Sequence, residues 1–128
     1  MDLKDDIVAI STPTGMGAIA LIRIAGDNAL KKVEPFFKSR KAGSISNIKS
    51  HSIIYGDFIY EDEIIDEVVL SYFAKGKSFT GQETVEISCH GSTYIQKTII
   101  EKLLTNNIRL AKPGEFTMRA FLNGKFDL

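Results

Sequence analysis

The sequence has little cysteine, little histidine, no excess charge and no long hydrophobic run, and each shortage excludes a class of protein. Its single cysteine, Cys89, cannot form an internal disulfide, which fits a reducing cytoplasm. The 16 Lys and Arg residues balance 16 Asp and Glu residues, so the net charge excludes a strongly basic nucleic-acid binder. The two histidines, His51 and His90, are far apart in the sequence, and we expect no metal site.

Hydrophobic residues are frequent but never form a long run. The longest apolar stretch, residues 18–22, is far shorter than the roughly 18–20 residues that span a bilayer. The acidic residues at 1–6 lack the apolar core of a signal peptide. We therefore expect a cytoplasmic protein with no membrane partner. At 128 residues and 44% hydrophobic content, the chain predicts one folded domain over 1–128.

Apolar runs bounded by turn residues predict strands, and apolar residues repeating every three to four positions predict helices. Asp27 or Asn28 can cap a helix that Pro35 should end, and Ser92 or Thr93 can cap a second helix. Because strands and helices are mixed along the chain, we expect an α+β domain with a mixed β-sheet and flanking helices. The predicted strands are 7–10, 18–24, 52–60, 64–73, 84–89 and 108–111, with 52–60 and 64–73 paired as a hairpin, and a last short helix is predicted at 116–122.

Arg23 and Glu86 are polar residues in apolar surroundings. Arg23 lies inside the apolar run 18–24, where an unpaired buried guanidinium would be costly. Three arrangements stay open: a strand end that reaches solvent, an anionic ligand, or a salt bridge to an internal carboxylate. Glu86 lies on the polar face of the strand at 84–89, where it either faces solvent or accepts hydrogen bonds from two adjacent donors. The donor edge of a pterin or a guanine would supply such a pair.

Two short motifs resemble cofactor or catalytic signatures. Residues 15–20 match the dinucleotide fingerprint G-x-G-x-x-G/A, but the apolar run that follows resembles a strand, not the helix that must face the pyrophosphate. A dinucleotide-binding enzyme domain is therefore the weaker alternative. Cys89 and His90 are adjacent in a strand, so their side chains should point to opposite faces and form no nucleophile pair. We expect a buried Cys89, with His90 at the following turn, and no catalytic residue in this chain.

Several motifs, in order and with the same spacing, resemble the N-terminal domain of the MnmE (TrmE) family of tRNA-modification GTPases. The resemblance covers essentially all 128 residues. The motifs are DIVAI at 6–10, TP at 12–13, GAI at 17–19, IRI at 22–24, FTG at 79–81, VEI at 85–87, CHG at 89–91 and PGEFTMRAFLNGKFDL at 113–128.

The resemblance implies a folate-binding domain similar to that of the aminomethyltransferases, which binds 5-formyltetrahydrofolate and pairs the subunits into a homodimer. By motif position, it implies folate contacts at Arg23, Glu86 and Lys125. The family's full-length enzyme adds a helical domain and a GTPase domain that uses GTP, potassium and magnesium. With the partner MnmG, it modifies C5 of the wobble uridine in certain tRNAs. The chain is accordingly expected to be the first module of a larger enzyme, without catalysis of its own.

This sequence departs from the family pattern in three loops. The usual Pro-Pro-Gly-Arg-Gly is PTGMG at 13–17, the usual His-Gly-Gly is HGS at 90–92, and the usual Gly-Glu-Asp is GQE at 81–83. The first change removes an arginine from a loop near the expected folate contacts. A second alternative therefore stays open, in which the domain keeps its fold as a protein-interaction module but has lost ligand binding.

Overall fold

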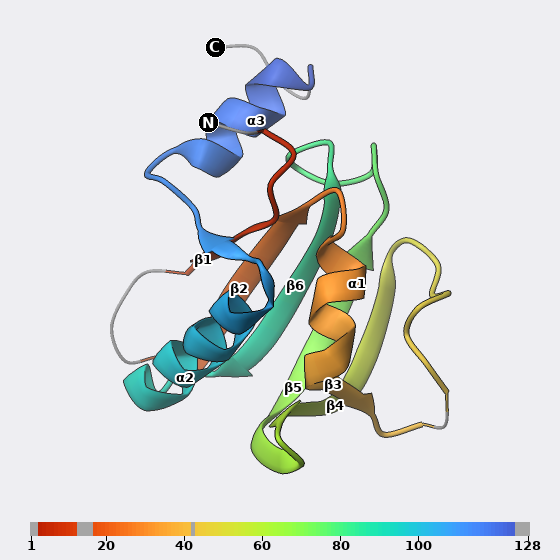
Figure 1. Cartoon of the computed structure of the whole chain (residues 1–128), viewed down its shortest axis with the longest axis vertical. Helices are drawn as coiled ribbons and strands as arrows, with labels where there is room; N and C mark the ends of the chain where they lie inside the picture. Colours follow the sequence, from red (N-terminus) through yellow and green to blue (C-terminus); the bar gives the residue numbers. More distant parts are fainter. Residues whose placement is uncertain (1–2, 13–16, 42, 125–128) are drawn as a thin grey trace.

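Figure 1 shows the computed structural model of the chain, in which residues 3–12, 17–41 and 43–124 are described. Two short 3₁₀ turns, Glu34–Phe36 and Leu104–Asn106, follow the first and second helices. The strands and helices, in chain order, are β1 (Ile7–Ile10), β2 (Ile19–Gly26), α1 (Ala29–Val33), β3 (Phe37–Ser39), β4 (Ser52–Tyr60), β5 (Glu63–Phe73), β6 (Glu83–His90), α2 (Thr93–Leu103), β7 (Arg109–Leu110) and α3 (Glu115–Leu122).

The seven strands of the described residues form one sheet in the order β3-β4-β5-β6-β2-β1-β7. Neighbouring strands are antiparallel except β1 and β7, which are parallel. This confirms the predicted α+β class, with a mixed sheet and flanking helices. The likeness to the folate-binding domain of the aminomethyltransferases stays a prediction.

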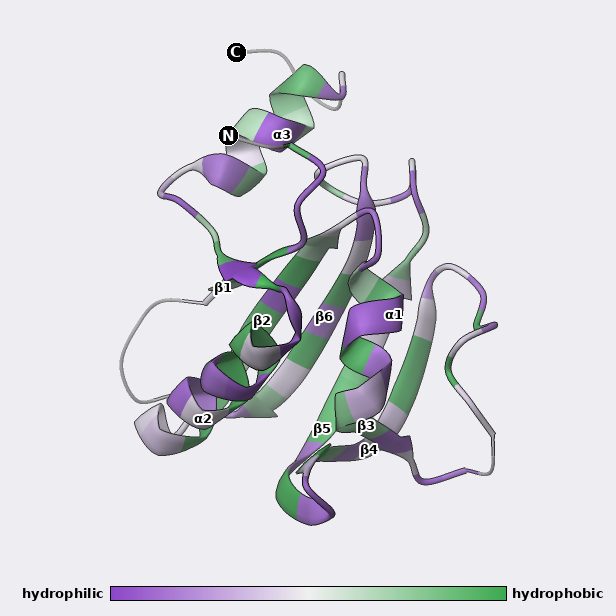
Figure 2. Cartoon of the chain, in the orientation of Figure 1, coloured by the Kyte–Doolittle hydropathy of each residue, from purple (hydrophilic) through white to green (hydrophobic). Residues whose placement is uncertain are grey.

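Six of the seven described strands lie close to their predicted positions because their signals are local. No strand was predicted at β3, whose three residues are too few to show an alternation. β4 and β5 form the expected hairpin, and the turn residues Glu61 and Asp62 have positive φ angles of 50° and 66°. The predicted alternation at 84–89 is confirmed in β6, where Val85, Ile87 and Cys89 are buried. Figure 2 shows the resulting alternation of hydrophobic and hydrophilic residues along this strand.

The core lies between one face of the sheet and the helices α1 and α2, while α3 lies beyond one end of the strands (Figure 1). Ile22, Leu70 and Ile87 from the central strands pack in the same buried cluster as Ile99 and Leu103 of α2. Side chains on the opposite side of these strands point away from the core. We call this side the open face, and its partly or fully exposed residues are Ile19, Leu21, Arg23, Ile53, Tyr55, Val69, Ser71, Glu86 and Ser88.

The first helix begins at the predicted position, but the prediction of its capping group is wrong. Asn28 occupies the N-cap position without a side-chain capping bond. Instead, the Asn28 N–H donates to Asp6 Oδ1 at 2.9 Å, and the Leu30 N–H donates to Glu83 Oε1 at 2.8 Å. The carboxylates come from outside the helix, so the spacing of residues around 27–30 could not reveal them.

The other helix boundaries agree with the prediction. α1 stops just before Pro35, which lies in the 3₁₀ turn that follows. Ser92 Oγ accepts the N–H of Ile95 at 3.3 Å and caps α2 as expected. Asn107 ends that helical segment in the left-handed conformation, with φ of 58°. Among the described residues, no helix is long and apolar enough to cross a membrane.

Candidate functional site

Arg23 and Glu86 lie side by side in the middle of the open face. They are register partners on the antiparallel strands β2 and β6. Arg23 Nε donates to Glu86 Oε2 at 2.8 Å, and the two side chains are 22% and 18% exposed. Of the three arrangements left open for Arg23, the structure shows the salt bridge with an internal carboxylate, at a position that solvent still reaches.

The ion pair leaves much of the hydrogen-bonding capacity of both groups unused. A guanidinium has five N–H donors, and only the Nε donor of Arg23 is bonded to Glu86. Within residues 3–12, 17–41 and 43–124, neither the Nη atoms of Arg23 nor Oε1 of Glu86 has a hydrogen-bond partner. The pair therefore presents a donor edge and an acceptor atom next to each other, and a planar polar ligand with the complementary edge could bind both.

Two aromatic rings flank the guanidinium of Arg23. The Arg23 Cζ atom lies 5.7 Å from the ring centroid of Phe79 and 5.7 Å from that of Phe116. Phe79 belongs to the loop between β5 and β6, and Phe116 lies in the first turn of α3. Phe79 is 49% exposed, so a large apolar surface remains accessible beside the ion pair.

Sequence reasoning singled out neither phenylalanine as a site residue. Each lies within a motif of the family resemblance, FTG at 79–81 and the run from Pro113, but neither motif indicates what its aromatic ring contacts. The contacts with Arg23 depend on the fold, which brings together residues 56 and 93 positions distant from Arg23 in the chain.

A buried network of charges attaches α3 to the sheet. Glu115 is 2% exposed and accepts bonds from Arg109 Nη1 and Nη2 at 2.8 and 2.7 Å and from Arg119 Nη2 at 2.9 Å. The hydrogen bonds from Arg109 lower the pKa of the Glu115 carboxyl to about 2, with the Lys112 N–H and the Arg119 guanidinium acting in the same direction. This network fixes the helix turn that carries Phe116.

The same network reaches the loop that carries Phe79. Arg119 Nη1 donates to the Asp5 carbonyl at 2.7 Å and to Gln82 Oε1 at 2.9 Å, and Asn123 Nδ2 donates to the Thr80 carbonyl at 2.9 Å. Gln82, one of the departures from the family pattern, thus has a structural role in this chain. Phe79 and Phe116 are consequently held on two segments that are bonded to each other.

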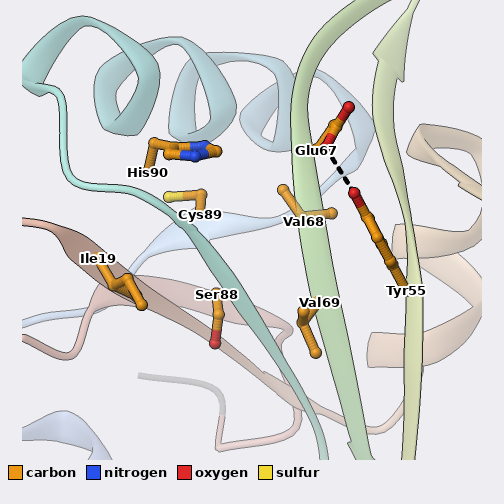
Figure 3. Close-up of a pocket in the computed structure, with 8 residues that line it drawn as sticks. All are labelled: Ile19, Tyr55, Glu67, Val68, Val69, Ser88, Cys89 and His90. Carbon is orange, nitrogen blue, oxygen red and sulfur yellow. Dashed lines mark hydrogen bonds between the residues drawn. The ribbon is translucent and has the colours of Figure 1, made fainter.

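A shallow hollow of about 280 Å³ opens on the same face, and Figure 3 shows the side chains that line it. Its lining combines an apolar floor with a polar edge, where the Tyr55 hydroxyl donates to the Glu67 carboxylate. Ser88 and Leu21 form the pair next to Arg23 and Glu86 along the strands, so the hollow continues from the ion pair. The lining residues are Ile19, Tyr55, Glu67, Val68, Val69, Ser88, Cys89 and His90.

Cys89 and His90 have the separate positions predicted for them. Cys89 is 3% exposed, and burial raises the pKa of its thiol to about 11, so the thiol is protonated at neutral pH. His90 lies at the end of β6, where the Asp66 carboxylate accepts its backbone N–H at 2.8 Å and bonds its Nδ1 at 2.7 Å. Within the described ranges, no three His, Cys, Asp or Glu side chains are grouped so as to hold a metal ion.

The structure counts against the dinucleotide-binding alternative. The fingerprint requires a helix directly after its glycines, but residues 19–26 form the strand β2. Gly15 and Met16 of that motif lie outside the described residues. Lys125, the third expected folate contact, also lies outside them, so the structure places Arg23 and Glu86 together and gives no position for Lys125.

Sequence comparisons identify relatives along the whole chain. The sequence model described as "GTP-binding protein TrmE N-terminus" matches residues 6–125. Over 128 residues, the chain is 49% identical to the tRNA modification GTPase MnmE of Christiangramia forsetii, 50% to that of Flavobacterium psychrophilum and 45% to that of Clostridioides difficile.

These alignments cover 100% of this chain but only 27%, 28% and 28% of the three relatives. The chain thus spans a little more than a quarter of the length of the relatives it matches. Because the family model matches nearly every residue from Asp6 onward, and the relatives are about half identical to it, the chain belongs to the TrmE N-terminus family, the N-terminal part of the tRNA modification GTPases named MnmE.

Proposed function

We propose that this domain binds 5-formyltetrahydrofolate on its open face and forms a homodimer, as the N-terminal module of a tRNA-modification GTPase. The observation that carries the proposal is the Arg23–Glu86 pair, which solvent reaches and which keeps spare donors beside a spare acceptor. A salt bridge with only a structural role does not require unused donors beside an unused acceptor, whereas a polar heterocycle would form hydrogen bonds with both.

Each residue of the pair has a separate role in the proposed complex. Glu86 accepts the 2-amino group and the ring N–H of the pterin, and Arg23 donates to a carbonyl or anionic part of the folate. Lys125 is the further cationic contact that family membership suggests. The residues fit the cofactor because the Nη atoms of Arg23 are donors for a pterin carbonyl, and Oε1 of Glu86 is an acceptor for a pterin N–H group.

The open face also supports the proposed homodimer. Ile19, Ile53 and Tyr55 are 67%, 73% and 50% exposed, although large apolar side chains on a sheet are normally covered. In the proposed homodimer, the open face of a second copy of this chain covers these side chains, so that the two faces bury them against each other.

The remaining activities belong to longer assemblies than this chain. The relatives are named tRNA modification GTPases, and this chain matches about a quarter of their length. We propose that hydrolysis of GTP with potassium and magnesium takes place in the rest of such a protein. Modification of the wobble uridine of tRNA, together with MnmG in the cytoplasm, is assigned to the full complex.

Calorimetric titration of the 128-residue chain with 5-formyltetrahydrofolate tests the folate proposal. We expect binding heat for the wild type and its loss in Arg23→Ala. The matched control is Arg40→Ala, which also removes an arginine paired with a carboxylate, that of Asp57 at 2.6 Å. Wild-type affinity in Glu86→Ala would refute the pterin assignment, and a folded dimer without binding heat would favour the interaction module that has lost its ligand.

A further inference from the structure

The structure contains two apolar groups at the site that the folate proposal does not use. Phe79 and Phe116 come from different segments, yet their ring centroids lie at the same 5.7 Å from Arg23 Cζ. We propose that these two phenylalanines are ligand-binding residues, which stack on the planar pyrimidinone ring of a pterin held by Arg23 and Glu86. This inference rests on the proposed folate function and adds two contacts to it.

Distances around the guanidinium place a ligand ring within reach of both phenyl rings. An acceptor bonded to an Nη atom of Arg23 lies about 4 Å from Cζ, because an N–H···O bond spans about 2.9 Å. The rest of a ring that carries this acceptor extends outward from there. Ring centroids 5.7 Å from Cζ lie in the same shell around the guanidinium. A heterocycle that bonds Arg23 on the side of these rings would therefore contact phenyl surface.

The chemistry of the surroundings favours a flat polar heterocycle over a simple anion. An inorganic anion would use the donors of Arg23 but would be repelled by the Glu86 carboxylate, which is bonded to the same guanidinium. It would also gain nothing from the apolar surface of Phe79, which is 49% exposed. A ring with an N–H donor beside a carbonyl satisfies Glu86 and Arg23 together and offers its faces to the phenyl groups.

The segments that carry the two phenylalanines are held by hydrogen bonds before any ligand binds. Asn123, one turn of α3 beyond Arg119, bonds the carbonyl of Thr80, the residue after Phe79. Glu115, the residue before Phe116, is bonded to Arg109 and Arg119. Groups that are ordered in the free protein lose little conformational entropy on binding, which favours affinity.

A purely structural role predicts a different outcome. If the rings only shield the ion pair through cation–π contact, replacing them should change stability and leave ligand affinity unchanged. The test therefore measures binding and unfolding separately. Leu retains apolar bulk without an aromatic face, and Tyr retains the face, so Phe79→Leu and Phe116→Leu are each compared with the corresponding Tyr variant.

The experiment titrates the wild type and these variants with intact 5-formyltetrahydrofolate, and by NMR with its two halves, a tetrahydropterin and p-aminobenzoylglutamate. We expect each Leu variant to bind the intact ligand and the pterin half about fivefold to tenfold more weakly, with unchanged affinity for the tail half. The Tyr variants should bind as the wild type does. Phe121→Leu is the matched control, because Phe121 is 42% exposed on the same helix α3.

Four outcomes would overturn the inference. Wild-type affinity in both Leu variants would show that the rings only shield the ion pair. A loss of affinity only for the p-aminobenzoylglutamate half would show that the rings contact that half and not the pterin. Absence of any folate binding by the wild type would overturn the proposed function itself, and the stacking role with it. If a Leu variant unfolds, an affinity loss in its folded Tyr counterpart overturns the role of the aromatic face.

Discussion

Arg23 and Glu86 neutralise each other at the centre of an exposed sheet face, and this has two consequences for binding. Each charge keeps its partner when the site is empty, which avoids leaving an unpaired charge among apolar strands. The pair can also bind a neutral heterocycle without a change in net charge. Removing one partner should therefore affect the other, so Arg23→Ala and Glu86→Ala should not have additive effects on affinity.

The charge of Glu115 should contribute to the stability of the fold. It is buried and bonded to two arginines, so Glu115→Gln removes a negative charge that compensates Arg109 and Arg119. Breaking a buried ion pair in this way costs about 3–5 kcal/mol, and we expect the free energy of unfolding at pH 7 to fall by about that amount. Urea unfolding followed by circular dichroism measures it. A loss under about 1 kcal/mol would contradict the role given to this network.

The pH dependence provides a second test of the same residue. The Glu115 carboxyl has a pKa of about 2 in the folded chain, below its ordinary value of 4.5, so folding favours the deprotonated form. The stabilisation is complete above about pH 5 and is lost as pH falls toward 2. Between these values, the wild type should lose more stability than Glu115→Gln does. Parallel stability curves for the two proteins would show that the shift is absent.

At the level of elements, the stability of the helix α1 depends on Asp6, a residue outside the helix. Asp6, 2% exposed, accepts the N–H of Asn28 and pairs with Lys32 Nζ at 2.7 Å. We expect Asp6→Ala to lower the free energy of unfolding by about 1–2 kcal/mol, because it removes the carboxylate that bonds the N–H of Asn28 at the start of α1 and pairs with Lys32. Asn28→Ala should cost less than about 0.5 kcal/mol, since the Asn28 side chain makes no capping bond. Thermal unfolding of both variants measures the two losses of stability, and equal losses would contradict the role of Asp6 as the group that caps α1.

The turn from β6 into α2 requires a glycine for steric reasons. A Cβ atom at Gly91 would lie 1.9 Å from the carbonyl oxygen and 2.6 Å from the carbonyl carbon of Gly17, and both are backbone atoms. The Gly91 N–H also bonds the Ala18 carbonyl at 3.1 Å, so the two segments cannot separate without losing that bond.

Gly91→Ala should therefore lower the free energy of unfolding by about 2–3 kcal/mol, because the backbone must shift to admit the methyl group. Gly17→Ala is the matched control, since the nearest non-neighbouring atom of the described residues to a Cβ there is the Ile19 carbonyl oxygen, at 3.9 Å. Denaturant titration of the two variants provides the comparison. If Gly91→Ala were as stable as Gly17→Ala, the close approach of the two segments would be refuted.

At the scale of the whole molecule, local patterns predicted six of the seven described strands and the β4–β5 hairpin, but not β3 or the other strand pairings. The strand at 84–89 and the helix after Ser92 depend on alternation and capping within a few residues. The order of the sheet depends on long-range pairing, which placed β2 beside β6 and so joined Arg23 to Glu86 across 63 residues. Phe79 and Phe116 could not be added to the site without that order, because an aromatic residue in a loop has no periodicity to interpret.

The sheet order also determines what the open face offers to a second copy. Ile53, Ser71, Glu86 and Arg23 are successive register partners across β4, β5, β6 and β2, so their side chains emerge on the same side. Ile19 lies at the start of β2 beside His90. Apolar side chains therefore flank the polar pair on a surface that extends over four strands. A dimer that uses this surface would lie against the ligand site.

A charge introduced on this face should break the proposed dimer without unfolding the chain. Ile53→Glu and Ile19→Glu replace side chains that are 73% and 67% exposed, so we expect little change in thermal unfolding of the monomer. Burying an unpaired carboxylate between two copies is costly, and dimer affinity should fall by at least about tenfold. Sedimentation equilibrium measures this, with Tyr94→Glu as control, because Tyr94 is 75% exposed on α2, which covers the other face of the sheet. If Tyr94→Glu weakened the dimer and the two isoleucine variants did not, the copies would pair through the helical side.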